Sequence, residues 1–468
     1  MIPLGIIEGD ALAELQKLET DSVDLIATDP PYGYSFMGKD WDRAVPSVAV
    51  WGECLRILKP GGFAFVMCAP RQDCLGKTVS SLSDAGFEMG FSSIYWAYGS
   101  GFPKAQNIGV TIDKRECQRQ LEAKLGRKAT KDEMEKAWKQ FRRVVGTKLG
   151  QPGYSLAAEL NPGGYSGMRY DPERECSVTT PATPEAQALD GSYAGFQPKP
   201  ALEVILVCMK PLSEKSYVKQ ALKDGKGVTW LDEGKIPCEK PHHDEAGRPS
   251  ASSSFIGKQS AWFSDKRGRF PANLLVSDDV LDDGRERSSG LLQKEYLSDT
   301  TQHTYGKWNH RSGAVIGDSG SFSRYFDLDR WWTERVKLLP QSVQQTFPFL
   351  IVSKPTKAEK NRGCEELPEQ RSRKWRDDTG MKYTGSGNPR TEKDKNFHPT
   401  VKPLKLMSYL ITLGSREKDL VLDPFVGSGT TCVAAQMLGR RCVGIDNDPE
   451  MCEVARARLS SVKQALLL

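Results

Sequence analysis

Strand-like and helix-like patterns alternate at both ends of the chain and not between them. Residues 1–110 and 396–468 contain short apolar runs separated by amphipathic stretches, whereas the roughly 285 residues between them are mostly polar. Strands that alternate with helices predict a parallel sheet. Each end is too short for a complete doubly wound sheet. We therefore expect the two ends to form one α/β sheet, with the middle of the chain inserted into it.

The two ends supply most of the expected elements. Predicted strands cover residues 4–8, 23–28, 63–68, 87–98, 420–422 and 442–445. Predicted helices cover residues 11–18, 48–58, 72–85, 404–413, 430–438 and 449–459. The sequence Lys-Pro-Gly-Gly at 59–62 is expected to stop the second helix, and 87–98 is expected to be a strand at the sheet edge.

The middle of the chain divides into three predicted parts. Residues 111–199 begin with two helices, 112–125 and 131–144, followed by a loop over 150–198 rich in Gly, Pro and Ser. Thr130 and Glu133 fit a capping box for the second helix. Residues 200–212 return to a strand of the sheet. Residues 213–395 show no clean periodicity.

Composition excludes several classes of protein. Hydrophobic residues are 38% and charged residues 27% of the 468, which suits a folded core and excludes wholesale disorder. No stretch approaches the roughly 18 consecutive apolar residues of a membrane span, and no secretory signal is apparent at the start. We therefore expect a soluble, cytoplasmic protein without a membrane partner.

Cysteine and histidine spacing predicts no metal site. The 11 cysteines are scattered without a C-x-x-C pair, which in such a chain indicates reduced thiols rather than a disulfide framework. Cys238, His242 and His243 form a metal-like cluster, but a fourth ligand at a recognisable spacing is missing. A polar surface turn accounts for these three residues, so no metal is expected.

Positive charge is concentrated in one part of the chain. The whole chain has a formal net charge of +5, whereas residues 101–150 hold 13 Lys and Arg against six Asp and Glu, a local net charge of +7. Such a surface suits a polyanion, because contacts with phosphates release counterions. A solvated helix face is the alternative, and charge alone leaves both open.

Asp29, Pro30, Pro31 and Tyr32 directly follow the apolar run 23–28. In open α/β sheets, functional groups gather at the carboxyl ends of strands. The Asp29 carboxylate and the Pro30 carbonyl are hydrogen-bond acceptors, and Tyr32 offers a flat face for stacking. Together they suit an amino group on a flat heterocycle. A plain turn with a solvated Asp29 and a packed Tyr32 is the alternative that the tetrapeptide leaves open.

A second motif places a glycine-rich turn between a strand and a helix, over residues 421–431 (VLDPFVGSGTT). Glycines let the backbone approach a ligand, and the following helix presents free N–H groups. The run lacks the spacing of a dinucleotide fingerprint and the lysine of a phosphate loop. Asp446 ends the next strand, where an acid commonly holds the hydroxyls of a ribose. The combination predicts a nucleoside cofactor without phosphates.

These motifs and their order resemble the β group of amino-methylating DNA methyltransferases, which use S-adenosylmethionine. In that family D-P-P-Y comes first and D-P-F-x-G-S-G-T-T comes last, as at 29–32 and 423–431 here. Residues 396–403 are similar to the family's segment before the cofactor loop. The resemblance covers roughly 1–110, 196–212 and 396–468. It implies a Rossmann-like methyltransferase fold with a mixed, mostly parallel sheet, circularly permuted motif order and an inserted target-recognition region at 213–395.

The resemblance also implies the residues of the site. Residues 1–110 would form the catalytic half of the methyltransferase domain, and residues 396–468 the cofactor-binding half. The implied catalytic residues are Asp29, Pro30, Pro31 and Tyr32. The implied cofactor-binding residues are Asp10 at the adenine, Asp446 at the ribose, Asn447 directly after it, Thr400 and Lys402 near the methionine carboxylate, and Asp423, Phe425, Gly427, Gly429 and Thr430 in the loop.

The substrate that the resemblance implies is an exocyclic amine of double-stranded DNA. Asp29 and the Pro30 carbonyl would accept the two N–H bonds of that amine, while Tyr32 stacks on the base. A base inside a duplex cannot reach such a pocket, so it must be flipped out. In this family Asp at the first motif position favours N6 of adenine, and N4 of cytosine is the alternative.

Other classes of function stay open at this stage. One is a DNA-binding regulator that has lost catalysis, which the intact motifs argue against. Another is a fused nuclease, for which Glu233-Gly234-Lys235 is only a three-residue match. RNA and protein substrates, a homodimer, and membership of a restriction–modification system or a phage are likewise left open by the sequence.

Overall fold

The computed structural model describes residues 4–33, 42–98, 106–149, 175–196, 201–237, 270–277, 281, 285, 287–288, 319–346, 357–368, 395–396 and 401–467. The chain divides into two compact units. Unit 1 comprises Met1–Gly99, Leu202–Gln370 and Lys395–Leu468, and unit 2 comprises Ser100–Ala201 and Arg371–Asp394. Both ends of the chain therefore belong to the same unit, as the alternation at the two ends predicted.

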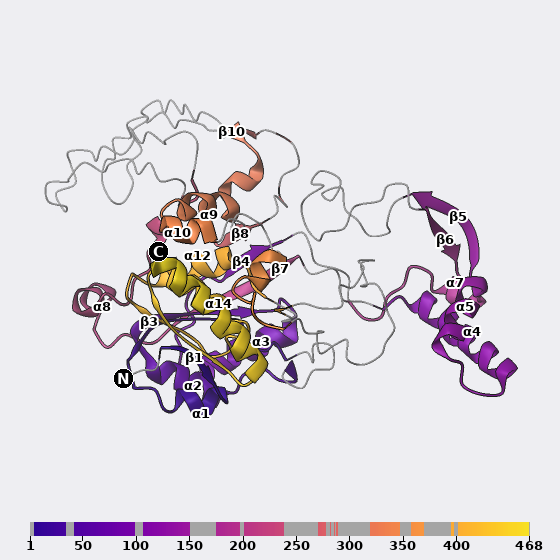
Figure 1. The fold of residues 1–468 in the computed structure, drawn as a ribbon, viewed down its shortest axis with the longest axis horizontal. Helices are drawn as coiled ribbons and strands as arrows, with labels where there is room; N and C mark the ends of the chain where they lie inside the picture. Colours follow the sequence, from indigo (N-terminus) through magenta and orange to yellow (C-terminus); the bar gives the residue numbers. More distant parts are fainter. Residues whose placement is uncertain are drawn as a thin grey trace, which may run out of the picture. The chain divides into compact units, whose positions relative to one another are not determined.

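Unit 1 is built on an eight-stranded sheet with the strand order β1-β12-β11-β2-β3-β7-β4-β8 (Figure 1). Its strands are β1 (Gly5–Glu8), β2 (Val23–Thr28), β3 (Leu58–Cys68), β4 (Ile94–Ala97), β7 (Leu202–Met209), β8 (Leu274–Val276), β11 (Leu420–Asp423) and β12 (Arg441–Asp446). Only β7 runs antiparallel to its neighbours in this sheet. The predicted α/β class, with a mixed and mostly parallel sheet, is confirmed.

The centre of the sheet joins the two ends of the chain. Strand β2 pairs in parallel with β11, with Leu25 opposite Val421 and Ile26 opposite Leu422. The carboxyl ends of parallel neighbours lie at the same edge of a sheet. The turn after β2 and the glycine-rich turn after β11 therefore lie side by side, although almost 400 residues separate them in the sequence.

Two apolar layers cover the two faces of the sheet. In β3, Phe63, Phe65 and Met67 belong to one buried cluster, whereas Ala64, Val66 and Cys68 belong to the other. This alternation is the two-residue period of a strand buried on both faces. The second face is covered by α1 (Ala11–Leu15), α2 (Val48–Ile57) and α3 (Gln72–Asp84), which supply Leu15, Trp51 and Leu82.

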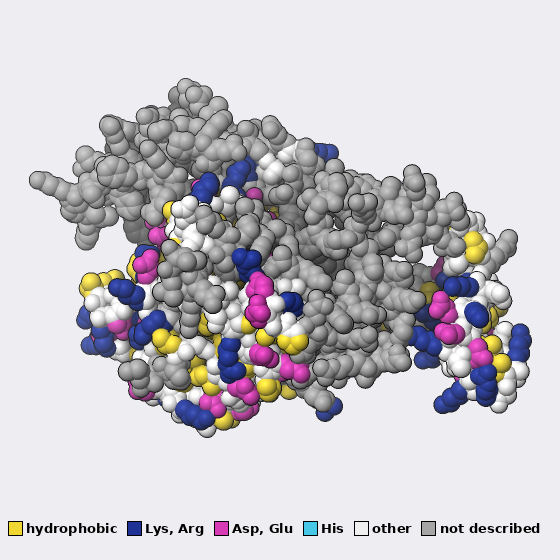
Figure 2. All heavy atoms as spheres, viewed as in Figure 1, with side chains coloured by type: hydrophobic (Ala, Val, Ile, Leu, Met, Phe, Trp, Pro, Cys, Tyr) yellow, Lys and Arg dark blue, Asp and Glu magenta, His cyan; other side chains and the backbone are white. Residues whose placement is uncertain are grey.

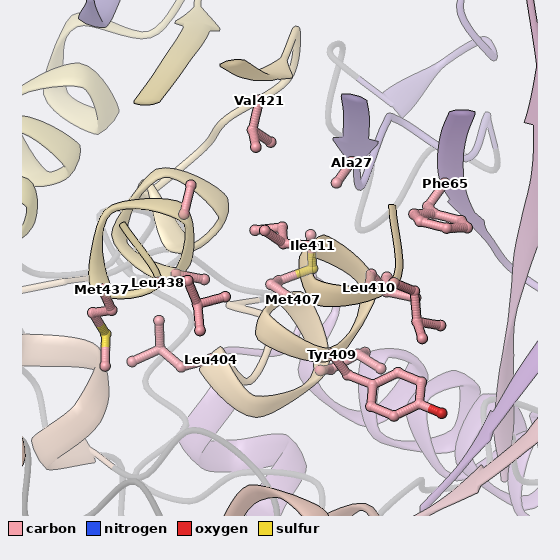
Figure 3. Packing of buried hydrophobic residues seen from close by; sticks show 14 of the residues in the cluster. Ala27, Phe65, Leu404, Met407, Tyr409, Leu410, Ile411, Val421, Met437 and Leu438 are labelled. Carbon is pink, nitrogen blue, oxygen red and sulfur yellow. The ribbon is translucent and has the colours of Figure 1, made fainter. Parts of the chain in front are cut away.

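Helix α12 (Leu404–Gly414) fills the first face, and all of its residues are buried. Figure 3 shows Met407, Leu410 and Ile411 among Ala27, Phe65 and Val421 of the strands. Helix α13 (Thr430–Met437) contributes Met437 to the same layer, and α14 (Pro449–Leu467) packs against α13. The burial of α12 on all sides explains why its sequence is mostly apolar, with Lys405, Ser408 and Thr412 as its buried polar residues.

Two predicted boundaries were wrong. The 59–62 segment does not separate α2 from a later strand, because β3 begins directly at Leu58. Its register with β2 jumps from Val23 opposite Leu58 to Leu25 opposite Phe63, so the Lys-Pro-Gly-Gly residues form an irregularity within the pairing. The strand expected at 87–98 is shorter, and it lies inside the sheet because β8 pairs with its outer side.

The region expected to lack periodicity contributes to the core of unit 1. Its elements include α8 (Tyr217–Asp224), η3 (Leu231–Gly234), β9 (Arg287–Ser288), β10 (Ser319–Gly320), η5 (Phe322–Tyr325), α9 (Leu328–Val336), α10 (Gln341–Thr346) and α11 (Lys357–Asn361). Trp331 and Trp332 of α9 are buried, and the Trp331 ring lies edge-on to Tyr409 at 4.8 Å. The absence of periodicity was therefore a wrong expectation for α9. A role for 213–395 in target recognition stays a prediction.

Unit 2 contains a helical pair and a two-stranded ribbon. Its described elements are α4 (Ile108–Leu125), α5 (Lys131–Phe141), β5 (Arg143–Leu149), β6 (Glu175–Thr180) and α7 (Pro184–Ala188). The Thr130–Glu133 capping box is confirmed. The predicted helix end at 144 was wrong because β5 starts at Arg143 and pairs with β6, which lies inside the stretch expected to be loop.

Buried Asp113 ties the parts of unit 2 together. Its Oδ2 atom accepts from Arg142 Nε at 3.1 Å and from the Ala182 backbone N at 3.0 Å, and its Oδ1 atom accepts from Thr183. Figure 2 shows Lys and Arg side chains interspersed with acidic ones on the visible face of this unit.

One pair of cysteines departs from the expectation of reduced thiols. Cys432 of α13 and Cys442 of β12 form a disulfide, which is possible because their Cα atoms lie 5.3 Å apart across the helix–strand packing. The free cysteines among the described residues, such as Cys54 and Cys208, are buried. In the part of the chain that the structure describes, no helix is both long and apolar enough to cross a membrane.

Candidate active site

The turn after β2 is held by an acid that sequence reasoning did not single out. Asp42 is buried, and its Oδ1 atom accepts hydrogen bonds from the backbone N of Tyr32 at 2.7 Å and of Gly33 at 2.9 Å. Gly33 has a φ of +74°, and a Cβ there would lie 2.8 Å from the backbone N of Val45. The turn that carries Asp29 and Tyr32 is therefore fixed by its backbone.

Four side chains from three segments meet beyond β2. Lys402 Nζ lies 2.6 Å from Asp29 Oδ2 and 3.3 Å from Glu203 Oε2. The Tyr32 hydroxyl donates to Asp29 Oδ1 at 2.6 Å and lies 3.3 Å from Glu203 Oε2. The side chains of Lys402, Asp29 and Glu203 are 10%, 20% and 18% exposed. We call these four residues the acidic clamp.

Burial and charge set the protonation of the clamp. Burial raises the pKa of the Tyr32 phenol, and the charges of Asp29 and Glu203 raise it further, so the hydroxyl stays protonated. Burial lowers the pKa of the Lys402 amine, but the charges of Asp29 and Glu203 outweigh that effect and raise this pKa above its ordinary value. At neutral pH, Lys402 is an ammonium and Tyr32 is a hydrogen-bond donor.

Asp423 connects the two motifs. Its Oδ1 atom accepts from the Thr28 hydroxyl of β2 at 2.6 Å and from the Phe425 backbone N at 3.1 Å. Its Oδ2 atom accepts from the Thr431 hydroxyl at 2.6 Å. Burial raises the pKa of Asp423 to about 6 despite these bonds, which lower it. Asp423 is only 2% exposed, so its carboxylate stabilises the glycine-rich turn through these hydrogen bonds and does not face solvent.

The glycine-rich turn depends on backbone freedom and close packing. Gly427 and Gly429 have φ values of +50° and +84°. A Cβ on Gly429 would lie 2.9 Å from Ala455 Cβ, so a side chain fits there only if α14 shifts. Buried Arg458 donates to the Ser428 carbonyl at 2.6 Å, which anchors the turn to α14.

Asp446 lies at the same sheet edge, beside the glycine-rich turn. Its Oδ2 atom accepts from Gly427 N at 2.8 Å and its Oδ1 atom from Asp448 N at 2.9 Å. A carboxylate oxygen has two lone pairs, so each oxygen keeps an acceptor position beyond these bonds. Burial is the main cause of the raised pKa of Asp446. The free acceptor pair fits two vicinal hydroxyls of a ribose.

The remaining predicted site residues are placed as follows. Asp10 caps α1 by accepting from Ala13 N at 3.1 Å, and Gly9 N bonds the Asp446 carbonyl, so Asp10 lies at the same edge. Asn447 is exposed and Thr430 is buried. Phe425 is half-buried, with its ring edge-on to Trp51 at 6.3 Å. Thr400 lies outside the described residues.

Glu203 is a functional candidate that the sequence analysis did not single out, although it is the one charged residue in the apolar run 201–209. That isolation is the signal that marks it, because a charge in a buried strand needs a partner. Asp42 and Thr28 carry no comparable signal in the sequence. Their roles are visible only in the tertiary structure, where Asp42 accepts from the backbone N of Tyr32 and Thr28 donates to Asp423.

The described residues include no group of three or more His, Cys, Asp and Glu side chains placed to hold a metal. Cys238, His242 and His243 lie outside those residues. A cavity of about 180 Å³ lies at the amino ends of the central strands, where Asp24, Lys226 and Asp419 line it. It is therefore at the opposite end of the strands from the clamp.

Comparison with known proteins finds related sequence in the C-terminal third. Residues 300–457 match the family model for N6/N4 methyltransferases, described as DNA methylase. The type II methyltransferase M2.DpnII of Streptococcus pneumoniae is 48% identical over 79 residues, 17% of this chain and 30% of that protein. The type II methyltransferase M.HindIII of Haemophilus influenzae is 44% identical over 73 residues, 16% of this chain and 24% of that protein.

Solved structures of DNA methyltransferases also align with the chain. M1.HpyAVI aligns over 98% of both chains with 12% identity and a TM-score of 0.34. The cytosine-N4-specific PvuII DNA methyltransferase aligns over 99% of this chain and 92% of that one, with 11% identity and a TM-score of 0.35. These TM-scores are too low to carry an argument about fold or function. Over residues 300–457 the chain is similar to the N6/N4 DNA methylase family, and it spans less than a third of the length of the type II methyltransferases that it matches.

Proposed function

We propose that this protein is an S-adenosylmethionine-dependent DNA methyltransferase of the N6/N4 type, and that its target is N6 of a flipped-out adenine. The observation that carries the proposal is the 2.6 Å hydrogen bond from Thr28 to Asp423. It joins the strand that ends in Asp-Pro-Pro-Tyr to the strand that ends in the glycine-rich turn. An amine acceptor and a nucleoside pocket are thereby neighbours at one sheet edge.

The proposed cofactor fits the residues that would hold it. Asp446 offers acceptors for ribose hydroxyls, the positive φ of Gly427 and Gly429 lets backbone approach the nucleoside, and Phe425 supplies an apolar wall. Asp10 would accept from the adenine amino group, and Asn447 and Thr430 follow Asp446 and Gly429 in the chain. Thr400 and Lys402 stay predicted near the methionine carboxylate. When bound, S-adenosylmethionine supplies an electrophilic methyl group on a sulfonium.

The clamp residues would prepare the target amine. The exocyclic nitrogen shares its lone pair with the ring, and two acceptors on its N–H groups favour a geometry in which that pair is free to react. We assign the acceptors to the Asp29 carboxylate and the Pro30 carbonyl, and the stacking surface to Tyr32. Pro31 would keep the turn rigid. Catalysis would then come from position and electrostatics rather than from a covalent intermediate with the protein.

Adenine is proposed over cytosine because Asp29 occupies the first position of the motif. The same chemistry serves N4 of cytosine, and the matched family model covers both amines. The relatives are named type II methyltransferases, which favours a site-specific enzyme of a restriction–modification system. The DNA recognition sequence, the oligomeric state and any phage origin stay predictions.

The test is incubation of the full chain with isotope-labelled S-adenosylmethionine and DNA of mixed sequence, followed by nucleoside analysis. We expect label in N6-methyladenine. Label in N4-methylcytosine would correct the target and keep the reaction class. A protein that does not bind S-adenosylmethionine in equilibrium dialysis would instead support a catalytically inactive DNA-binding regulator.

A further inference from the structure

The acidic clamp contains a positive charge, the Lys402 ammonium, that has no part in the proposed binding of the target amine. Asp29 is the proposed acceptor for the target amine, yet its Oδ2 atom lies 2.6 Å from the Lys402 ammonium. A charge-assisted hydrogen bond is stronger than one to a neutral amine. A target amine must therefore share Asp29 with Lys402, and Lys402 interferes unless another group holds it.

Glu203 is that other group by position. Strand β7 runs antiparallel to β3, with Val204 opposite Cys68 at the carboxyl end of β3. The first residues of β7 consequently lie at the sheet edge where the parallel strands end. Glu203 Oε2 reaches both the Lys402 ammonium and the Tyr32 hydroxyl at 3.3 Å.

The clamp places two acids against one ammonium. Lys402 contributes one positive charge and is mostly buried, Asp29 and Glu203 contribute two negative charges, and Tyr32 is neutral. With Glu203 present, the Lys402 ammonium can move away from Asp29 and still pair with a carboxylate, that of Glu203. Without Glu203, Asp29 is the single acid in contact with this buried ammonium among the described residues, so the ammonium stays on Asp29.

We propose that Glu203 is a positioning residue that holds Lys402 and the Tyr32 hydroxyl, and so frees Asp29 for the target amine. The proposal rests on the proposed function for its consequence in catalysis. The holding of Lys402 by two carboxylates is a property of the folded protein and is testable without DNA.

The first experiment measures the titration of Lys402 in the DNA-free protein. Lysines are labelled with trace acetic anhydride across a pH series, and the Lys402 peptide is quantified by mass spectrometry. We expect Glu203→Gln to lower the labelling midpoint of Lys402 by about one pH unit or more, as loss of a contacting opposite charge predicts. Among the described residues, the titratable groups that contact Lys402 are Asp29, Tyr32 and Glu203. The control is Glu214→Gln, which removes an acid that pairs with Lys223 outside the clamp. An unchanged Lys402 midpoint in Glu203→Gln overturns the proposal.

A second variant covers the case in which Glu203→Gln does not fold. Asp29→Asn leaves Glu203 as the one acid of the clamp. We expect its Lys402 midpoint to stay at or above that of exposed lysines such as Lys124. A midpoint below those lysines would mean that Glu203 does not hold the ammonium, because burial alone lowers the pKa of an amine.

The second experiment measures methyl transfer. We expect Glu203→Gln to lower kcat at least about tenfold, with KM for S-adenosylmethionine changed less than about twofold, as for an interaction that acts in the reaction step. Glu203→Asp should recover part of the rate. A Glu203→Gln enzyme with wild-type kcat contradicts the proposal, as does equal loss in Glu203→Gln and Glu203→Asp. If the wild-type protein transfers no methyl group, the proposed function fails, whereas the labelling experiment still decides the role of Glu203.

Discussion

At the scale of single residues, Asp29 is the group on which the proposed chemistry depends. Its carboxylate is partly exposed beyond β2, and within the described residues its hydrogen bonds are with the side chains of Tyr32 and Lys402. We therefore expect Asp29→Ala to abolish methyl transfer and to leave S-adenosylmethionine affinity within about threefold of wild type. Single-turnover assays and equilibrium dialysis measure the two quantities. The matched control is Asp73→Ala, which removes an exposed acid of α3. A folded Asp29→Ala protein that methylates at the wild-type rate would remove Asp29 from the mechanism.

Gly429 allows a sharper residue-scale prediction because the chain offers a matched partner. Gly439 has a similar φ of +75°, but the nearest atom to its added Cβ is 3.6 Å away on the flexible Glu417 side chain. We expect Gly439→Ala to cost about 1 kcal/mol of unfolding free energy, the cost of a left-handed alanine. Gly429→Ala adds overpacking against Ala455 and should cost about 3 kcal/mol in total. Urea unfolding measures the unfolding free energy of both variants. Equal losses would show that α14 shifts at no cost to make room for the alanine at position 429.

At the scale of elements, a buried acid links α11 to α12. Glu359 Oε1 accepts from the Leu404 backbone N at 2.9 Å, two residues after Lys402. Burial raises the pKa of Glu359 to about 7, although the Leu404 N–H, Arg458 and Lys405 lower it. The folded state therefore holds a proton that the unfolded chain, with its ordinary value of 4.5, releases earlier as the pH rises.

The sign of this linkage predicts a pH dependence of stability. Between about pH 4.5 and pH 7 the folded state binds more protons than the unfolded state, so the unfolding free energy falls as the pH rises. Asp423, with its pKa raised to about 6, acts in the same direction. We expect Glu359→Gln, which keeps an acceptor for Leu404, to reduce this slope. Urea unfolding at a series of pH values tests it, and an identical slope in the variant would contradict the assignment.

At the scale of the whole molecule, we expect the basic residues of unit 2 to contribute to DNA affinity. Lys124, Lys128 and Lys131 are exposed around the connection between α4 and α5. Exposed cations near a polyanion contribute to affinity through counterion release. We expect the triple change to Glu to weaken DNA binding and to reduce the salt dependence of log affinity by about two to three. The matched control reverses Lys77, Lys215 and Lys337, which are exposed in unit 1. Equal affinity and equal salt slope would mean that the basic residues of unit 2 are a solvated face.

How much the sequence predicts also differs by scale. The strand at 23–28 and the order of the two motifs were predictable because apolar runs, Pro-Pro and glycine-rich turns are local signals. Helix α12 was predictable as an apolar helix. Strand β8 and the inner position of β4 were not, because three residues of strand pattern carry too little information and pairing partners come from elsewhere in the chain.

The sequence by itself determined the α/β class, the motif order and the residues that end the central strands, because these depend on periodicity and on backbone preferences within a few residues. Only the tertiary structure decided that Lys402 contacts Asp29, that Glu203 completes the clamp and that Asp42 fixes the turn. These contacts join segments that are far apart in the sequence or that lack a hydrophobic periodicity. Their energies come from burial and charge pairing across the folded sheet edge, which no local stretch of sequence encodes.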